Sequence, residues 1–428
     1  MKSIIELLNE NKKVSAWKLT EVETESCELF YVLKKLETNR ATNTKDISLT
    51  IYVDNEGTRG SSDVVIYSYM GEDEIRKVIE EGVYSASFAQ NKFYEIPSKN
   101  EEEIRFEVSN LSEKPFVNVI EDIVKAVFKA DVHKDGWINS TEFFLYKKTF
   151  HIRNSKGVDV TYSRYYGNIE VIPTWKSEKE EVELYKMIEF GNLDLDYITK
   201  EVEDILLLAK LRSEAVTLPK GVKANILLTD EEAQQIIDNF VSDLSYSSEY
   251  THMSLSKVGE SVQGKEIKGD KLNVKLVPSL INSVRNSPID RDGVILKELE
   301  VIKDGVALTR HGDYRFGYYL GEEHPTGSYS NMKVECGSTS EKDLKKEPYI
   351  ECLKFSGMQM DKFSGFFGGE VRLGIYFDGE KTYPVTGFSI SGNMNEKKSE
   401  LVLSKEGIST SSGYEGPKYI LVPGMDIA

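Results

Sequence analysis

Short strand-like segments separated by Gly- and Asp-rich turns fill the chain beyond residue 272. Two of these turns are Lys303-Asp304-Gly305 and Asp378-Gly379-Glu380, and each lies between β-branched and aromatic residues. Regular alternation of short strands with tight turns is typical of a β-sandwich or a partly closed barrel. We therefore predict a β-rich, sandwich-like or barrel-like carboxy-terminal domain.

One amphipathic helix is predicted to lead this domain. Thr229 and Glu232 have the spacing of a capping box, in which each side chain satisfies an unpaired backbone amide of the first turn. The apolar positions that follow recur at helical spacing: Ala233, Ile236, Ile237, Phe240, Val241 and Leu244. Pro219 and Gly221 interrupt the pattern before this helix, so the main boundary is placed there and the carboxy-terminal domain at residues 222–428.

The first hundred residues alternate between strand-like and helix-like segments. Strands are predicted at 28–33, 47–53 and 64–69, with a turn at 54–57, and a helix is predicted over 72–88. The polar stretch 97–103 is interpreted as a linker. These features predict an α/β domain at residues 1–105.

A second unit of helices and strands is predicted at residues 106–218. It opens with a helix that Ser112 would cap and that carries Pro115 in its first turn. Two long strand-like stretches, 143–153 and 159–173, are joined by a hairpin turn at 154–157, and a helix follows at 195–215. The fold class is therefore α+β: a two-part amino-terminal half, then a β-rich carboxy-terminal domain.

Charge and composition narrow the classes of partner. The 428 residues include 54 Lys and Arg against 71 Asp and Glu, a formal net charge of −17. Nucleic acids and anionic membranes require clustered cations, so neither is expected as a partner. The amino terminus has no signal-peptide core, no run approaches ~20 apolar residues, and three cysteines are too few for a disulfide framework. A cytoplasmic location is expected.

Residues 131–142 match the spacing of a calcium-binding loop. Oxygen ligands are available at Asp131, Asp135, Asn139 and Glu142, and Gly occupies the sixth position. The third position, however, is His133, whose nitrogen is a poor ligand for a hard cation, and the following segment alternates like a strand. A solvated turn from helix to strand is the favoured interpretation, with calcium binding as the alternative.

No catalytic motif is visible in the residues themselves. None of the five histidines precedes Glu, so the helical zinc-hydrolase motif is absent, and residues 387–392 miss the spacing of a serine nucleophile elbow. His311, His324 and Cys336 could meet in the β-rich domain and bind a metal ion. The alternative is that both histidines lie in polar surface loops.

An ordered series of segments carries a resemblance to a known family. Residues 287–294 read Ser-Pro-Ile-Asp-Arg-Asp-Gly-Val and residues 324–327 read His-Pro-Thr-Gly; further matching segments are 301–306, 368–374, 378–379 and 383–393. Weaker matches lie at 57–60, 91–97 and 154–157. In this order they resemble the TldD/PmbA family, whose members were once labelled modulators of DNA gyrase.

The resemblance implies a two-lobed protein that forms dimers around a chamber in which unfolded peptides are cut. It further implies a zinc site built from His-Glu-x-x-x-His on the first helix of the carboxy-terminal domain and a distal Cys. In this chain the corresponding segments are 229–240, which contains no histidine, and 409–416, which contains no cysteine. Both zinc elements are missing, as they are in the TldE (PmbA) branch of the family. The resemblance therefore implies a non-catalytic partner of a zinc-bearing TldD-type subunit.

The resemblance therefore predicts a non-catalytic subunit with no catalytic residue and no metal of its own, so whether the chain acts as an enzyme is left open. Zinc is expected in a TldD-like metallopeptidase partner, and unfolded peptide is the expected substrate. The alternatives are a homodimeric peptide-binding scaffold and an independent metallohydrolase that uses His311, His324 and Cys336. The residues predicted to face peptide in the chamber are Asp290, Gly293, Arg310, His324, Thr326 and Asn393.

Overall fold

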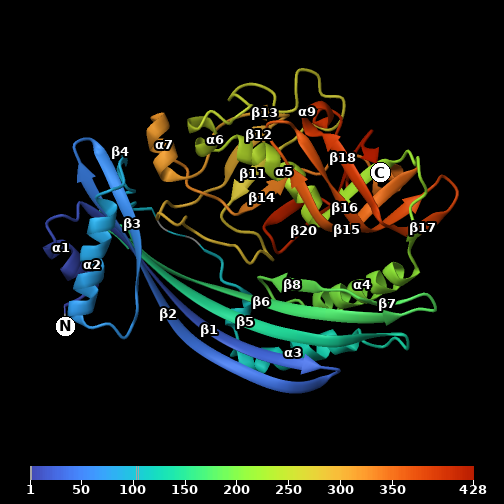
Figure 1. The fold of residues 1–428 in the computed structure, drawn as a ribbon, viewed down its shortest axis with the longest axis horizontal. Coiled ribbons are helices and arrows are strands. Elements are labelled where there is room, and N and C mark those ends of the chain that lie inside the picture. Colours follow the sequence, from blue (N-terminus) through green and yellow to red (C-terminus); the bar gives the residue numbers. More distant parts are fainter. Residues whose placement is uncertain (1, 103, 105) are drawn as a thin grey trace.

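The computed structural model, which describes residues 2–102, 104 and 106–428, shows a two-part α+β protein (Figure 1). Its described residues form three sheets of eight, nine and six strands, and none of them closes into a barrel. The first sheet belongs to the amino-terminal half, and its long strands sweep beneath the two sheets of the carboxy-terminal half (Figure 1). The predicted fold class is confirmed.

The first sheet has the order β4-β3-β2-β1-β5-β6-β7, with β8 also paired to β6. Its strands are β1 (Ala16–Val32), β2 (Lys35–Asn55), β3 (Thr58–Ile66), β4 (Asn91–Lys92), β5 (Gly136–Asn154), β6 (Asp159–Lys176), β7 (Glu181–Glu183) and β8 (Lys186–Phe190). The turns predicted at 54–57 and 154–157 join β2 to β3 and β5 to β6. Because β1 pairs with β2 on one side and β5 on the other, this sheet contains strands from both of the domains that the sequence predicts at residues 1–105 and 106–218.

Helices cover one face of this sheet. They are α1 (Ile4–Glu10), α2 (Glu72–Ala86), α3 (Phe116–Lys129) and α4 (Leu195–Glu214). Odd-numbered strand residues such as Leu19, Phe143 and Leu145 are buried in two apolar cores with these helices. In β1, β2, β5 and β6 the even-numbered residues lie on the opposite face because side chains alternate along a strand, and in β3 the odd-numbered residues Ser61 and Asp63 do. We call this second face the inner sheet face, since several of its residues line a cavity shared with the carboxy-terminal half.

The helix α3 begins later than its predicted cap. Pro115 is the N-cap residue, and Ser112 lies three residues earlier, at the end of the 3₁₀ turn η1 (Asn110–Ser112). The Ser112 hydroxyl donates to the Ser109 carbonyl at 2.7 Å, so it is already engaged within that turn. The prediction of a Ser112 cap is therefore wrong; the extended backbone of Pro115, with ψ 141°, starts the helix instead.

Two sheets and one long helix form the carboxy-terminal half. The nine-stranded sheet contains β9 (Val216–Thr217), β10 (Asn225–Thr229), β15 (Tyr349–Met360), β16 (Phe366–Phe377), β17 (Thr382–Thr386), β18 (Phe388–Asn393), β19 (Val402–Leu403), β22 (Tyr419–Val422) and β23 (Asp426–Ile427). The six-stranded sheet contains β11 (Val274–Val277), β12 (Leu299–Lys303), β13 (Val306–Ala307), β14 (Asn331–Val334), β20 (Gly407–Ser409) and β21 (Tyr414–Pro417).

The helix α5 (Asp230–Asp243) supplies the centre of the carboxy-terminal core. Its predicted apolar positions are buried together with side chains of both sheets, among them Val274 of β11 and Phe367 of β16. The remaining helices are short: α6 (Tyr246–Tyr250), α7 (Tyr314–Leu320), α8 (Glu341–Leu344) and α9 (Met394–Lys397). Within the described ranges, no helix combines the length and the apolar character that a membrane crossing requires.

The predicted capping box at the start of α5 is not formed. Thr229 occupies the N-cap position with an extended backbone, but its side chain caps no helix amide. Thr229 is also the last residue of β10, where it pairs with Tyr419, and the next residue, Asp230, turns the chain with a positive φ of 50°. The strand thus fixes the orientation of Thr229 and the Asp230 turn starts the helix.

Candidate functional site

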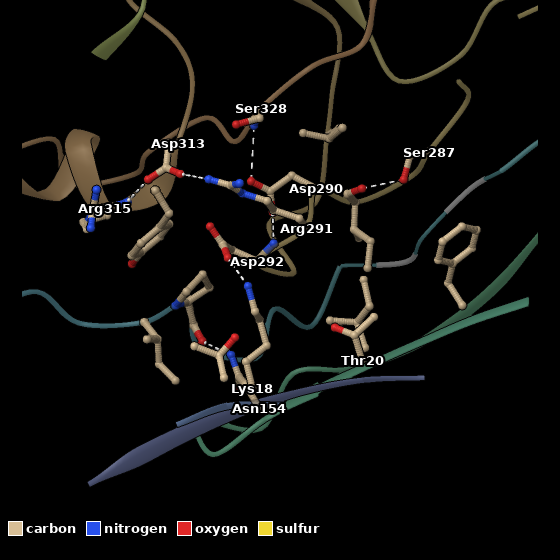
Figure 2. Close-up of a pocket in the computed structure, with 18 of the residues that line it drawn as sticks. Lys18, Thr20, Asn154, Ser287, Asp290, Arg291, Asp292, Asp313, Arg315 and Ser328 are labelled. Carbon is tan, nitrogen blue, oxygen red and sulfur yellow. Dashed lines mark hydrogen bonds and ion pairs between the residues drawn. The ribbon is translucent and has the colours of Figure 1, made fainter. Parts of the chain in front are cut away.

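A cavity of about 750 Å³ lies between the inner sheet face and the loops of the carboxy-terminal half (Figure 2). One wall comes from β1, β2, β3, β5 and β6, and the other from segments 277–296 and 313–331. Lys18 of β1 reaches across and forms an ion pair of 2.6 Å with Asp292, and both side chains are less than one-fifth exposed. This ion pair, visible in Figure 2, ties the two halves together at the cavity.

Asp290 holds the loop that forms the carboxy-terminal wall. Its carboxylate accepts backbone amides of Asp292 and Val294, each at 2.9 Å, and of Ser328 at 3.2 Å. Burial, followed by the charge of Asp292, raises the pKa of Asp290 to about 6. Gly293 completes this turn with a φ of +95°, a conformation that favours glycine. Of the predicted chamber residues, Asp290 lines the cavity and Gly293 shapes the loop beside it.

The other predicted chamber residues lie outside the cavity lining. Arg310 pairs with Glu249 and donates to the Ser256 carbonyl at 3.0 Å. Thr326 accepts the Gly312 amide at 3.3 Å through its hydroxyl. These contacts give Arg310 and Thr326 local structural roles in the loops around α6 and α7.

His324 and Asn393 are also separate from the cavity. The His324 side chain is 90% exposed. Asn393 caps α9 by accepting the Asn395 amide at 3.0 Å, and its own amide donates to the Ser364 carbonyl at 2.9 Å. The structure therefore does not bring these two predicted residues together with Asp290.

The three candidate metal ligands do not form a ligand cluster. The described residues contain no group of three or more His, Cys, Asp or Glu side chains that could hold a metal ion. His311 is buried, with Nε2 at 2.9 Å from the Val241 carbonyl, and burial lowers its pKa. His324 and Cys336 are exposed. A site built from His311, His324 and Cys336 has no support in this arrangement.

Residues 131–142 form the turn from α3 into β5. Asp131 pairs with Lys34 at 3.1 Å, and β5 begins at Gly136. Asn139 and Glu142 consequently lie within a strand, where the Asn139 amide donates to Glu183 at 2.9 Å. The second helix of a calcium-binding hairpin is replaced by this strand, so the favoured interpretation, a helix-to-strand turn, is the one observed.

The segments 229–240 and 409–416 meet in the structure. Gln234 of α5 accepts a hydrogen bond from the Ser412 hydroxyl at 2.7 Å. Near it on the same helix, burial raises the pKa of Glu232 to about 7, and burial also raises the pKa of Asp238. The contact thus joins the Gln234 amide to the Ser412 hydroxyl, near the carboxyl groups of Glu232 and Asp238. A catalytic zinc site in this position would need imidazole or thiolate donors. These residues do not fit a zinc ion.

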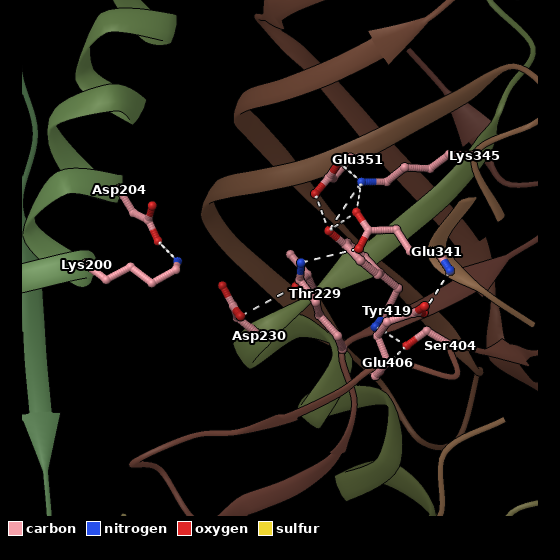
Figure 3. A network of polar contacts seen from close by, with 11 residues as sticks. Lys200, Asp204, Thr229, Asp230, Glu341, Lys345, Glu351, Ser404, Glu406 and Tyr419 are labelled. Carbon is pink, nitrogen blue, oxygen red and sulfur yellow. Dashed lines mark hydrogen bonds and ion pairs between the residues drawn. The ribbon is translucent and has the colours of Figure 1, made fainter. Parts of the chain in front are cut away.

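A polar network lies beside Thr229, which pairs with Tyr419 at the end of β10 (Figure 3). Lys345 pairs with Glu341 at 2.7 Å and with Glu351 at 2.8 Å, and the Tyr419 hydroxyl lies 3.1 Å from an oxygen of each carboxylate, so that its one proton can be donated to either. The Lys345 ammonium also lies 4.6 Å from the centre of the Tyr419 ring. Because every charge in this cluster has a partner, the network stabilises the junction of α8, β15 and β22 rather than offering a binding site.

Comparisons with known proteins assign the carboxy-terminal half of the chain to a family. The family model described as "PmbA/TldA metallopeptidase C-terminal domain" matches residues 221–428. The carboxy-terminal half of the chain belongs to the TldD/PmbA family. The Metalloprotease PmbA of Escherichia coli O157:H7 is 24% identical over 213 residues, which are 48% of this chain and 46% of that protein. The match therefore spans about half the length of this curated relative.

Solved structures share the fold over nearly the whole chain. TldE from Thermococcus kodakarensis has a TM-score of 0.80 at 14% identity, with both chains fully covered. A putative modulator of DNA gyrase from Bacteroides thetaiotaomicron has a TM-score of 0.80 at 16% identity, covering 99% of this chain and 97% of that one. A similarly described protein from Thermotoga maritima has a TM-score of 0.74 at 18% identity, with 96% of each chain covered.

Several residues that line the cavity were not predicted from the sequence. They are Tyr162, Arg164, Arg285 and Arg315, and none of them lies in a segment that carries the family resemblance. The signal that could have found Tyr162 and Arg164 is the alternation along β6, where even-numbered residues share one face. The sequence does not show which face of the sheet is covered by helices, so this alternation alone did not assign them to a cavity.

Proposed function

We propose that this TldD/PmbA-family chain is a TldE-like, non-catalytic subunit of a zinc metallopeptidase that degrades or processes unfolded peptides. The observation that carries the proposal is the contact between Gln234 and Ser412. It joins the two segments in which the family resemblance places zinc ligands, and neither side chain is an imidazole or a thiolate. A catalytic zinc ion needs three protein ligands and an open position, which this donor set does not supply.

In this proposal the partner is a TldD-like subunit that brings the zinc ion, and this chain contributes a wall of the peptide chamber. The fold likeness to TldE from Thermococcus kodakarensis over the full chain supports the assignment to this branch. The cavity between the two halves and the open strand edges of the sheets offer surfaces for an extended peptide, which can pair with a sheet edge through its backbone.

The test combines elemental analysis with peptide cleavage. The purified chain is assayed for zinc and for casein cleavage alone, and then after mixing with the zinc-bearing TldD-like protein of the same host. We expect no stoichiometric zinc and no cleavage alone, a stable mixed complex by size exclusion, and cleavage by the mixture above that of the partner.

Two results would contradict the proposal. Stoichiometric zinc with cleavage by the chain alone would show an independent metallohydrolase. A stable dimer of this chain that binds peptide but neither binds the partner nor changes its activity would instead show a homodimeric scaffold.

A further inference from the structure

The side chains that line the cavity include more cations than carboxylates. Its walls carry five cationic side chains, Lys18, Arg164, Arg285, Arg291 and Arg315, and four carboxylates, Asp63, Asp290, Asp292 and Asp313. Two of the cations are paired, Lys18 with Asp292 and Arg291 with Asp313. Arg164, Arg285 and Arg315 form no ion pair with any side chain of the described residues. In a chain with a net charge of −17, such a gathering of unpaired arginines is unusual.

The remaining carboxylates are occupied by other groups. Asp63 accepts the Thr50 hydroxyl at 2.5 Å, and Asp290 accepts three backbone amides. Each carboxylate of the cavity is therefore held by a hydrogen bond or an ion pair that fixes the wall. None of them is positioned as the counter-ion of the three unpaired arginines, which leaves their guanidinium groups available to a ligand.

Arg164 is held in place by aromatic rings. Its guanidinium carbon lies 5.2 Å from the centre of the Phe150 ring and 5.8 Å from that of Tyr166. Its buried Nε has no hydrogen-bond partner among the residues that the structure describes. Arg164 also lines a smaller neighbouring cavity of about 160 Å³. A stacked guanidinium loses less freedom when it binds a planar anion, and its fork of N–H groups matches a carboxylate.

Aromatic rings flank Arg164 on both sides along the inner sheet face. We call these rings the aromatic row: Phe30 of β1, Phe144, Tyr146 and Phe150 of β5, and Tyr162 and Tyr166 of β6. Phe150 and Tyr162 form one pair, 4.9 Å apart, and the other four rings form a series with neighbours 5.1 to 6.2 Å apart, centre to centre. Arg164 joins the two groups, since its guanidinium contacts the rings of Phe150 and Tyr166. All six side chains are partly exposed. The row offers aromatic surface beside a cationic cavity, with the Lys148 ammonium over the rings of Tyr146 and Tyr166. Such a surface suits an extended chain with one anionic group.

We propose that the cavity binds a carboxylate of an unfolded peptide through Arg164, with Arg285 and Arg315 beside it, and that the peptide lies along the aromatic row. The carboxylate is either the carboxy-terminal group or an acidic side chain, because both present the same planar anion. The inference rests on the proposed function only in taking the ligand to be a peptide. It adds a preference for negative charge that the proposed function does not contain.

The experiment measures fluorescence anisotropy of a labelled, unstructured peptide with the purified full chain. Three peptides of one sequence are compared: a free carboxy-terminal acid with one internal Glu, the same peptide amidated at its end, and the acid with the internal Glu replaced by Gln. We expect about tenfold weaker binding for whichever change removes the bound carboxylate, and weaker binding of the acid at higher salt.

The protein variant is Arg164→Gln, with Arg372→Gln as the matched control. Arg372 carries the same charge, is 61% exposed and lies outside the cavity. We expect Arg164→Gln to bind the acidic peptide about tenfold more weakly and to lose the difference between acid and neutral peptide, whereas Arg372→Gln keeps both. Arg164→Lys, which keeps the charge but not the planar fork, should retain part of the preference. Urea unfolding of each variant separates lost binding from lost folding.

The inference is overturned if all three peptides bind the wild-type chain equally, or if folded Arg164→Gln binds like Arg372→Gln. These failures differ from failure of the proposed function. If the chain activates the TldD-like partner but does not prefer acidic peptide, the proposed function stands and this inference is wrong. If the chain prefers acidic peptide but does not affect the partner, this inference stands and the proposed function is wrong.

Discussion

Replacing Glu232 by Gln is expected to change how the stability of the protein depends on pH. Glu232 lies on α5, where burial is the main cause that raises its pKa from 4.5 to about 7. The nearby charge of Glu231 adds to this rise, and Lys354 opposes it. Since the unfolded chain ionises near 4.5 while the folded chain keeps its proton to about 7, stability falls as the pH rises through this window.

The size of the effect follows from the raised pKa. A difference of one pKa unit between the folded and unfolded states is worth about 1.4 kcal/mol, so the rise from 4.5 to about 7 corresponds to about 3 kcal/mol above neutral pH. Glu232 keeps some contact with solvent, which screens part of this cost. We therefore expect the free energy of unfolding of Glu232→Gln, relative to that of the wild type, to rise by about 2 kcal/mol between pH 5 and pH 8.

Urea unfolding at pH 5 and pH 8 measures this gain directly, as the difference between variant and wild type at each pH. Other titrating groups, such as His311, are present in both proteins and cancel in that difference. Glu231→Gln is the control, because Glu231 is exposed and should alter the pH dependence much less. A stability difference between Glu232→Gln and wild type that stays constant from pH 5 to pH 8 would refute the reasoning.

Three further changes test individual contacts, one between the two halves and one within each half. Lys18→Met leaves the mostly buried Asp292 unpaired and should lower the free energy of unfolding by about 1–3 kcal/mol. The control Lys35→Met removes an ion pair on the surface and should lower it by less than ~0.5 kcal/mol. Equal effects of the two substitutions in urea unfolding would contradict this. Gly167→Ala places a methyl group 2.1 Å from the Phe190 ring and should cost about 1–3 kcal/mol, unlike Gly357→Ala, which meets open space; a stable Gly167→Ala protein would argue against the packing at β8. The lowered pKa of His311 means that the unfolded chain binds its proton more tightly, so stability should fall as the pH drops below 6.5, and thermal unfolding of His311→Gln should show a weaker fall.

Local structure was predictable where it depends on neighbours in the sequence. The turn at 154–157 was predicted from its Asn and Gly, and Asn154 indeed accepts the amides of Lys156 and Val158 through its side chain. The caps at Ser112 and Thr229 failed because each residue is committed elsewhere: Ser112 to a 3₁₀ turn, and Thr229 to strand β10. A cap motif in the sequence does not reveal such competing partners.

The candidate site was less predictable because distant segments build it. Lys18 meets Asp292, and Tyr162 accepts the Ser287 hydroxyl at 2.9 Å, although each pair is separated by more than a hundred residues. The matching motifs include the loop of Asp290, which lines the cavity, but they do not show that β1, β5 and β6 form the opposite wall. Strand β1 was also predicted too short, since its charged residues Glu21, Glu23 and Glu25 hide the alternation that continues from Ala16.

The pairing of β1 with β5 has a consequence for the order in which the protein can form during synthesis. Leu19 lies opposite Arg153, so β1 cannot gain its second neighbour until on the order of a hundred further residues have left the ribosome, a delay of roughly ten seconds at usual elongation rates. For that interval the β1–β2–β3 meander presents a free edge that can recruit foreign strands. Its exposed flank carries Glu21, Glu23 and Glu25, and like charges of this kind discourage two nascent chains from joining edge to edge.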